Sequence, residues 1–110
     1  MDYEISMDAY QIIRINKIKL HSILRKDINY VNNLLCEVQL ITPREKRNLI
    51  ATTRNRYRDS TWELMNRILD KGEESCIVFL SILKDPALIE KFPDLLSMAW
   101  YNHPEVMNGR

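Results

Sequence analysis

The chain of 110 residues contains only two glycines, Gly72 and Gly109, and four prolines. Sandwiches and small barrels of β-strands need frequent turns that draw on glycine, so this scarcity disfavours an all-β fold. It also excludes the glycine-rich loop motifs that hold phosphate groups in many nucleotide-binding proteins. The length suits one domain, and an apolar content of 45% suffices for a modest core. The composition therefore predicts one small, mostly helical domain.

Cysteine and histidine are also scarce. Cys36 and Cys76 lie in apolar surroundings and form no CxxC pair, which favours a reducing, cytoplasmic location. His21 and His103 are too few and too far apart to suggest a metal cluster, and we expect no cofactor. The chain shows no signal peptide and no apolar stretch of 18 residues. We expect no catalytic activity, because the apolar run around Cys76 should raise the pKa of its thiol and make it a poor nucleophile. A catalytic domain further downstream in a longer protein remains an open alternative.

The net charge of +1 conceals an uneven distribution along the chain. Residues 1–40 carry five Lys or Arg and five Asp or Glu, residues 41–71 carry eight against four, and residues 72–110 carry three against six. The three blocks therefore have net charges of 0, +4 and −3. Such polarity favours oriented protein association over uniform binding to a polyanion.

Capping signals define the first three predicted helices. Asp8 is a candidate N-cap, and the apolar residues at 12–24 do not form one stripe, which predicts a bent helix or one buried on more than one side. A second helix is expected after Asp27, where apolar residues recur at helical spacing through 38. The segment Thr42-Pro-Arg-Glu45 predicts a capping box for a third helix that ends near 52–53.

The second half of the chain predicts three more helices. The fourth begins at 59 or 60, where Ser60-Thr-Trp-Glu63 is a second capping-box pattern, and Lys71-Gly72 marks its end. Residues 73–84 are nearly all apolar after an acidic start, which favours a central helix over the competing interpretation of a buried strand. Asp85-Pro86 opens a sixth helix that Pro93 interrupts, and a further turn is expected within 95–100.

Four aromatic side chains are candidates for packing. We expect Trp62 and Phe79 to lie in the core. Trp100 and Tyr101 either pack against the bundle or form part of an exposed patch.

The order and spacing of these segments resemble the caspase recruitment domain (CARD) of the death-fold superfamily. The resemblance covers roughly residues 10–92 and is strongest over residues 69–80, LDKGEESCIVFL. In that family the fourth helix typically ends in an apolar residue followed by Lys-Gly, and a polar turn then leads to a Phe-Leu pair in the fifth helix. The segments LKDPAL at 83–88 and LIT at 40–42, with Glu45 after it, are similar to two further helix junctions of the family.

The resemblance implies an all-α, six-helix antiparallel bundle over residues 10–92, with an extension at 1–9 and an extension or linker at 93–110. It also implies protein–protein recruitment between CARDs in apoptotic or inflammatory signalling. Family members commonly pair a basic surface on helices 1 and 4 with an acidic surface on helices 2 and 3. The matching basic positions here are Arg14, Lys17, Arg25, Lys26, Arg56, Arg58 and Arg67.

The acidic counterpart is sparse. It comprises Asp27, Glu37 and Glu45, diluted by Arg44, Lys46 and Arg47. This dilution favours a domain that receives an acidic partner on its basic surface.

A second contact is expected from Asp70, Glu73 and Glu74 at the junction of helices 4 and 5. Two alternatives stay open: a freestanding decoy CARD that inhibits assembly, and a small helical nucleic-acid-binding domain. For the second alternative, Tyr57 lies among Arg54, Arg56 and Arg58 and could stack on a base. The simplest explanation is that the three arginines are solvated charges of the connector and that the three acidic residues stabilise helix ends.

Overall fold

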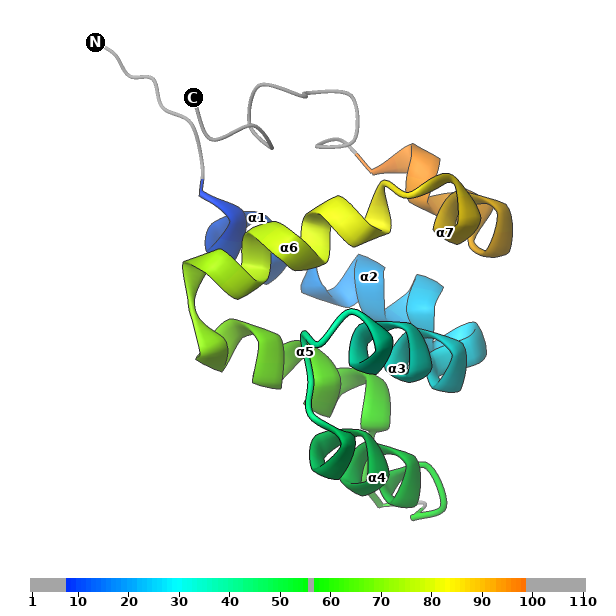
Figure 1. Cartoon of the computed structure of the whole chain (residues 1–110). Helices are drawn as coiled ribbons and strands as arrows, with labels where there is room; N and C mark the ends of the chain where they lie inside the picture. The colour runs from blue at the N-terminus through cyan, green and yellow to red at the C-terminus, as the bar shows by residue number, and fades with distance from the viewer. Residues whose placement is uncertain (1–7, 56, 99–110) are drawn as a thin grey trace, which may run out of the picture.

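The computed structural model describes residues 8–55 and 57–98, which form helices joined by short connectors, with no strand among these residues. Figure 1 shows the arrangement. The elements in chain order are α1 (Ala9–Ile15), α2 (Lys17–Leu24), the 3₁₀-helix η1 (Arg25–Asp27), α3 (Ile28–Glu37), α4 (Pro43–Thr52), α5 (Ser60–Lys71), α6 (Glu73–Leu83), α7 (Pro86–Lys91) and the 3₁₀-helix η2 (Pro93–Ser97). The prediction of an all-α fold is confirmed, and residues 73–83 form a helix rather than a strand.

The first predicted helix is interrupted at Asn16, which confirms the bend. Asn16 ends α1 and precedes α2, and its side-chain Nδ2 donates a hydrogen bond to the main-chain oxygen of Ile12 at 2.8 Å. On either side of this break Ile13 and Leu20 are fully buried, whereas Ile15 and Ile18 are largely exposed. The break therefore redirects the helix so that only part of its apolar surface reaches the core, which explains why no single stripe runs through the sequence.

Four of the predicted boundaries coincide with caps in the structure. Asp8 accepts a hydrogen bond from the N–H of Gln11, and Asp27 accepts one from the N–H of Tyr30. Thr42 and Glu45 form the complete reciprocal capping box at the start of α4. The boundary between α5 and α6 falls at Gly72, whose φ of 106° and ψ of −175° favour glycine.

The second predicted capping box is wrong. Asp59, not Ser60, caps α5 by accepting from the N–H of Trp62 at 3.1 Å. The Ser60 hydroxyl is buried and donates to the main-chain oxygen of Leu49, while the Glu63 carboxylate pairs with Arg58. The predicted capping box does not form because the Asp59 carboxylate already caps the helix and the Ser60 hydroxyl bonds to another helix.

Helix α6 packs against both α1 and α5. Cys76, Phe79, Leu80 and Leu83 are fully buried in this arrangement. The apolar side chains of α6 are not all buried, however, since Ile77 and Val78 are 36% and 43% exposed. Trp62 likewise is only half-buried at the edge of the core, whereas Phe79 lies inside it as predicted.

The packed core extends past residue 92 and begins before residue 10. Ala9, Leu95 and Met98 belong to the buried cluster, and Lys26 forms an ion pair with Asp94 at 3.0 Å. Pro93 interrupts α7 as predicted, and the turn expected within 95–100 is the short helix η2 that begins at Pro93. Trp100 and Tyr101 lie outside the described residues. No helix in 8–55 or 57–98 has the length and apolar character needed to cross a membrane.

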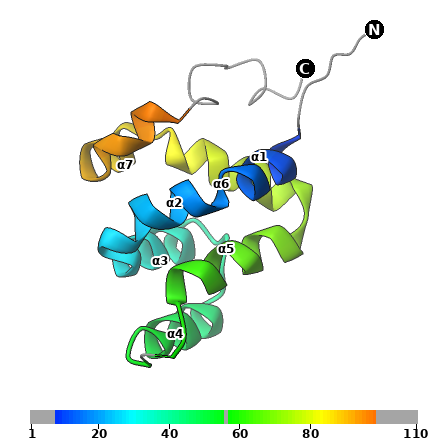
Figure 2. The same ribbon diagram turned by 180° about the vertical axis from the view of Figure 1, so that it is seen from behind.

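Helix α4 lies at one end of the molecule and α6 and α7 at the other, with α2, α3 and α5 between them (Figures 1 and 2). Helix α4 contacts α3 and α5. Only one face of α4 is buried as a result, through Leu49 and Thr52, and the rest of its surface faces solvent.

We expect Gly72→Ala to lower the free energy of unfolding by about 2 kcal/mol, because the backbone at this position lies in a region that only glycine adopts without strain. No atom lies within 4 Å of an added Cβ, so the cost reflects the backbone conformation alone. Urea unfolding measures this loss of stability, with Ser22→Ala, a change at an exposed helical position, as the control variant. Equal stability of Gly72→Ala and wild type would contradict the assigned conformation.

Candidate functional site

Two of the three predicted acidic residues form ion pairs within the molecule. The Asp27 carboxylate accepts the Lys91 ammonium at 2.8 Å in addition to capping α3. The hydrogen bond from Lys91 is the main reason that the pKa of Asp27 lies below its usual value, and the same contact raises the pKa of Lys91. Glu37, by contrast, is exposed and forms no ion pair with a described residue.

Glu45 is the most heavily engaged carboxylate. It accepts the N–H of Thr42 at 2.9 Å and the Lys71 ammonium at 3.1 Å, and the Arg67 guanidinium lies 3.6 Å away. Burial alone raises the pKa of Glu45, but the bonds from Thr42 and Lys71 and the two positive charges outweigh it and leave the pKa lowered. The charge of Glu45 therefore serves to join α4 to α5.

The predicted basic surface is divided by its own intramolecular contacts. Lys17 donates a hydrogen bond to Asn66 and lies 4.5 Å above the Trp62 ring, between α2 and α5. Lys26 pairs with Asp94 in η2. These two cations hold neighbouring elements together.

Two other predicted cations meet at α4. Arg58 forms a bidentate pair with Glu63 at 2.7 and 2.8 Å, and Arg67 faces Glu45. Both arginines line one hollow between α4 and α5. Arg56 lies outside the described residues.

Arg14 and Arg25 are exposed and form no ion pair with any residue in 8–55 or 57–98. Arg14 lines a separate shallow hollow with Gln11 and Ile15. The structure thus brings Arg58 and Arg67 together, whereas Arg14 belongs to a different depression.

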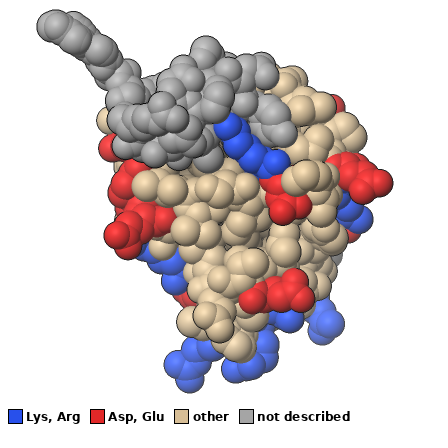
Figure 3. All heavy atoms as spheres, turned by 45° about the horizontal axis from the view of Figure 1, so that its top comes forward, with Lys and Arg blue, Asp and Glu red and all other residues tan. Residues whose placement is uncertain are grey.

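A group of exposed cations lies on α4 and on the connector that follows it. We call this group the α4 pole; it consists of Arg44, Arg47, Arg54 and Arg58. Arg44, Arg47 and Arg54 are exposed and form no ion pair with a described residue. Figure 3 shows Lys and Arg side chains gathered at the end of the molecule where α4 lies. In the sequence these cations belong to the basic block at 41–71, where Arg44 and Arg47 also dilute the acidic surface.

The predicted second contact keeps two of its three members at the surface. Asp70 and Glu74 are exposed at the corner between α5 and α6. Glu73 instead reaches the N-terminus of α1, where its two oxygens accept the N–H groups of Ala9 and Tyr10 at 2.8 and 2.9 Å. It neutralises backbone donors that α1 leaves unpaired at its first turn. The sequence carries no signal for this contact, which spans more than sixty residues.

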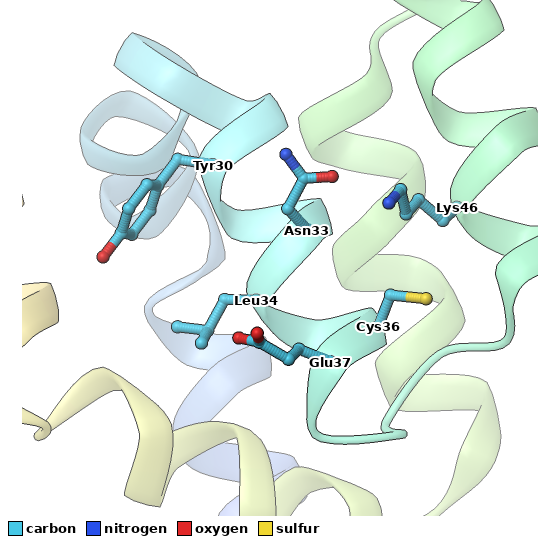
Figure 4. A pocket seen from close by; sticks show the side chains of 6 residues that line it. All are labelled: Tyr30, Asn33, Leu34, Cys36, Glu37 and Lys46. Carbon is cyan, nitrogen blue, oxygen red and sulfur yellow. The ribbon is translucent and has the colours of Figure 1, made fainter.

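A further hollow lies between α3 and α4 and has a volume of about 430 Å³. Figure 4 shows its lining side chains: Tyr30, Asn33, Leu34, Cys36, Glu37 and Lys46. Charges of both signs and an apolar side chain share this wall, so it presents no set of groups suited to one chemistry.

The two cysteines have no reactive setting among the described residues. Cys36 is half-buried, whereas Cys76 is buried and burial raises its pKa to about 11, in the direction predicted. No three His, Cys, Asp or Glu side chains in 8–55 and 57–98 are grouped to hold a metal ion.

Comparison with known proteins found no matching family model, no matching curated protein and no matching solved structure.

We expect Glu45→Gln to lower the free energy of unfolding by about 1 kcal/mol at pH 7, because glutamine keeps the capping box but not the pairing with Lys71 and Arg67. A lowered carboxylate pKa stabilises the fold above the unfolded value of 4.5 and loses that effect as the pH falls through the folded value. The difference between variant and wild type should therefore shrink between pH 5 and pH 3 in urea titrations.

Glu37→Gln is the matched control, since Glu37 is exposed and unpaired among the described residues. A stability difference for Glu45→Gln that stays constant over this pH range would contradict the role assigned to the carboxylate charge.

Proposed function

We propose that this chain is a CARD-type interaction module that recruits another CARD-containing protein, in the cytoplasm, through complementary charge. Three features of the fold support the proposal. The first helix is broken at Asn16 and is followed by five further α-helices, and the fourth of the six predicted helices stops at Gly72 within the segment most similar to the family. Helix α6 then packs between α1 and α5.

The α4 pole is the observation that carries the proposal. Arg44, Arg47 and Arg54 form no ion pair with described residues, while the nearby carboxylates Glu45 and Glu63 are already paired with other cations. Arginine is suited to this role because its guanidinium binds a carboxylate through two parallel hydrogen bonds. The partner that fits is therefore a CARD with an exposed acidic surface.

Charge reversal at the pole tests the proposal. The variant R44E/R47E/R54E should lose at least tenfold in affinity for a CARD that the wild type binds, and wild-type association should weaken as salt rises from 0.05 to 0.3 M. Binding is measured by interferometry against a panel of purified CARDs, and circular dichroism confirms that the variant is folded.

The matched control is R14E/R25E, which reverses two exposed arginines of the originally predicted surface and is expected to bind within twofold of wild type. Equal loss in both variants would show that net charge matters rather than the pole. Unchanged binding by R44E/R47E/R54E would place the surface elsewhere, and wild-type binding to no CARD in the panel would reject recruitment.

The pairing of Asp27 and Glu45 inside the fold favours a decoy role within the same proposal. A chain that offers cations but few free carboxylates on α3 and α4 can receive one partner and lacks the acidic surface needed to add the next copy. Light scattering at rising concentration separates the two roles, because a decoy stays small and a nucleator forms filaments.

The second candidate function is nucleic-acid binding. Tyr57 is 87% exposed and lies in the connector between Arg54 and Arg58, an arrangement that suits stacking on a base beside phosphate contacts. Short duplexes and single strands are titrated across a salt series, and absence of binding at about 0.1 M salt eliminates this candidate.

A further inference from the structure

A second feature of the region near α4 is the hollow between α4 and α5, with a volume of about 300 Å³. Its described lining comes from α4, the connector and α5 and consists of Asn48, Ala51, Thr52, Asn55, Arg58 and Arg67. The wall is predominantly polar, and none of these residues is acidic. Two residues with guanidinium groups and two with side-chain amides, all hydrogen-bond donors, therefore line one depression.

Arg67 has donors to spare. Its side chain is only 34% exposed, its Nη1 lies 3.6 Å from Glu45, and its buried Nε has no hydrogen-bond partner among the described residues. That separation is longer than a hydrogen bond. The Arg67 guanidinium is therefore paired with Glu45 by charge without a hydrogen bond, and its Nε and Nη donors make no hydrogen bond with a described residue.

The neighbouring groups also keep donors free of intramolecular bonds. Arg58 uses Nε and Nη2 on Glu63, which leaves Nη1. Asn55 uses its Oδ1 to accept from the N–H of Tyr57, which leaves its amide donor. The Asn48 side chain makes no hydrogen bond with a described residue; the hydroxyl of Thr52 donates to the main-chain oxygen of Asn48.

We propose that this hollow, the α4–α5 hollow, binds a phosphate group. A planar carboxylate accepts along one edge, whereas a tetrahedral phosphate accepts on several sides and matches donors that approach from three elements. The absence of a glycine-rich loop does not oppose this assignment, because side chains supply the donors here rather than backbone amides. The proposal is independent of CARD recruitment, since a chain that binds no CARD still contains the hollow.

The test is an NMR titration of the full, ¹⁵N-labelled chain with inorganic phosphate and, separately, with a nucleoside triphosphate, at constant ionic strength kept by NaCl. The expected shifts fall on amides within 48–55, at Arg58 and at Arg67. Shifts with inorganic phosphate assign the site to a free phosphate group, and shifts with the triphosphate alone assign it to a nucleotide; both support the proposal. No shift with either probe overturns it.

Two variants separate the hollow from the general charge of the region. Arg67→Gln should weaken phosphate binding about tenfold, whereas Arg47→Gln removes an exposed arginine of α4 outside the hollow and should change it less than twofold. Asn48→Ala removes a donor from an exposed position without touching the Glu45 contacts and should weaken binding two- to fivefold with unchanged stability. Equal weakening by Arg67→Gln and Arg47→Gln overturns the proposal, as does an Asn48→Ala variant that binds like wild type.

Discussion

Helix α6 packs against α1, α5 and α7 and so joins the start, the middle and the end of the described chain. Phe79, Leu80 and Leu83 are fully buried there. The burial of three such side chains provides several kcal/mol of the driving force for folding. Glu73 at the first turn of α6 completes this junction by capping α1, so the start of the described chain is tied to a helix far along the sequence. Gly72 makes the junction possible, because the chain reverses there in a backbone conformation that other residues resist.

This framework decides which charges remain for a partner. Four charged side chains each bond to a residue of another element: Asp27, Glu45, Lys17 and Lys26. Their charged groups therefore already have partners within the molecule. Three cations of the α4 pole, Arg44, Arg47 and Arg54, form no ion pair with a described residue, and α4 lies at an end of the bundle and buries only one face. The α4 end of the surface is therefore basic although the net charge of the chain is only +1.

Local signals predicted most of the fold. The caps at Asp8, Asp27 and Thr42 and the stop at Gly72 depend on residues three or four positions apart, so they could be recognised directly in the sequence. The break at Asn16 was recognisable only as a spread of isoleucines with no single stripe. Where tertiary contacts compete with local ones the pattern misled, as at Ser60, whose hydroxyl bonds to Leu49 in place of capping α5.

The surface was harder to predict because partners distant in sequence decide which charges are free. The pairing of Asp27 with Lys91, the reach of Glu73 to Ala9 and the meeting of Arg58 with Arg67 across one hollow all require the folded arrangement. Asn32 illustrates the same limit in the core: it is fully buried with both side-chain polar atoms unpaired among the described residues, and nothing in the surrounding sequence distinguishes it from a surface asparagine.

The central claim is that the α4 pole receives the partner. Mapping of amide chemical shifts on the ¹⁵N-labelled chain, with an unlabelled CARD that binds it, tests this claim most directly. We expect the largest changes to cluster at 44–58, with little change around Arg14 and Arg25. Changes centred on Glu37 and the exposed face of α3, with α4 unaffected, would contradict it.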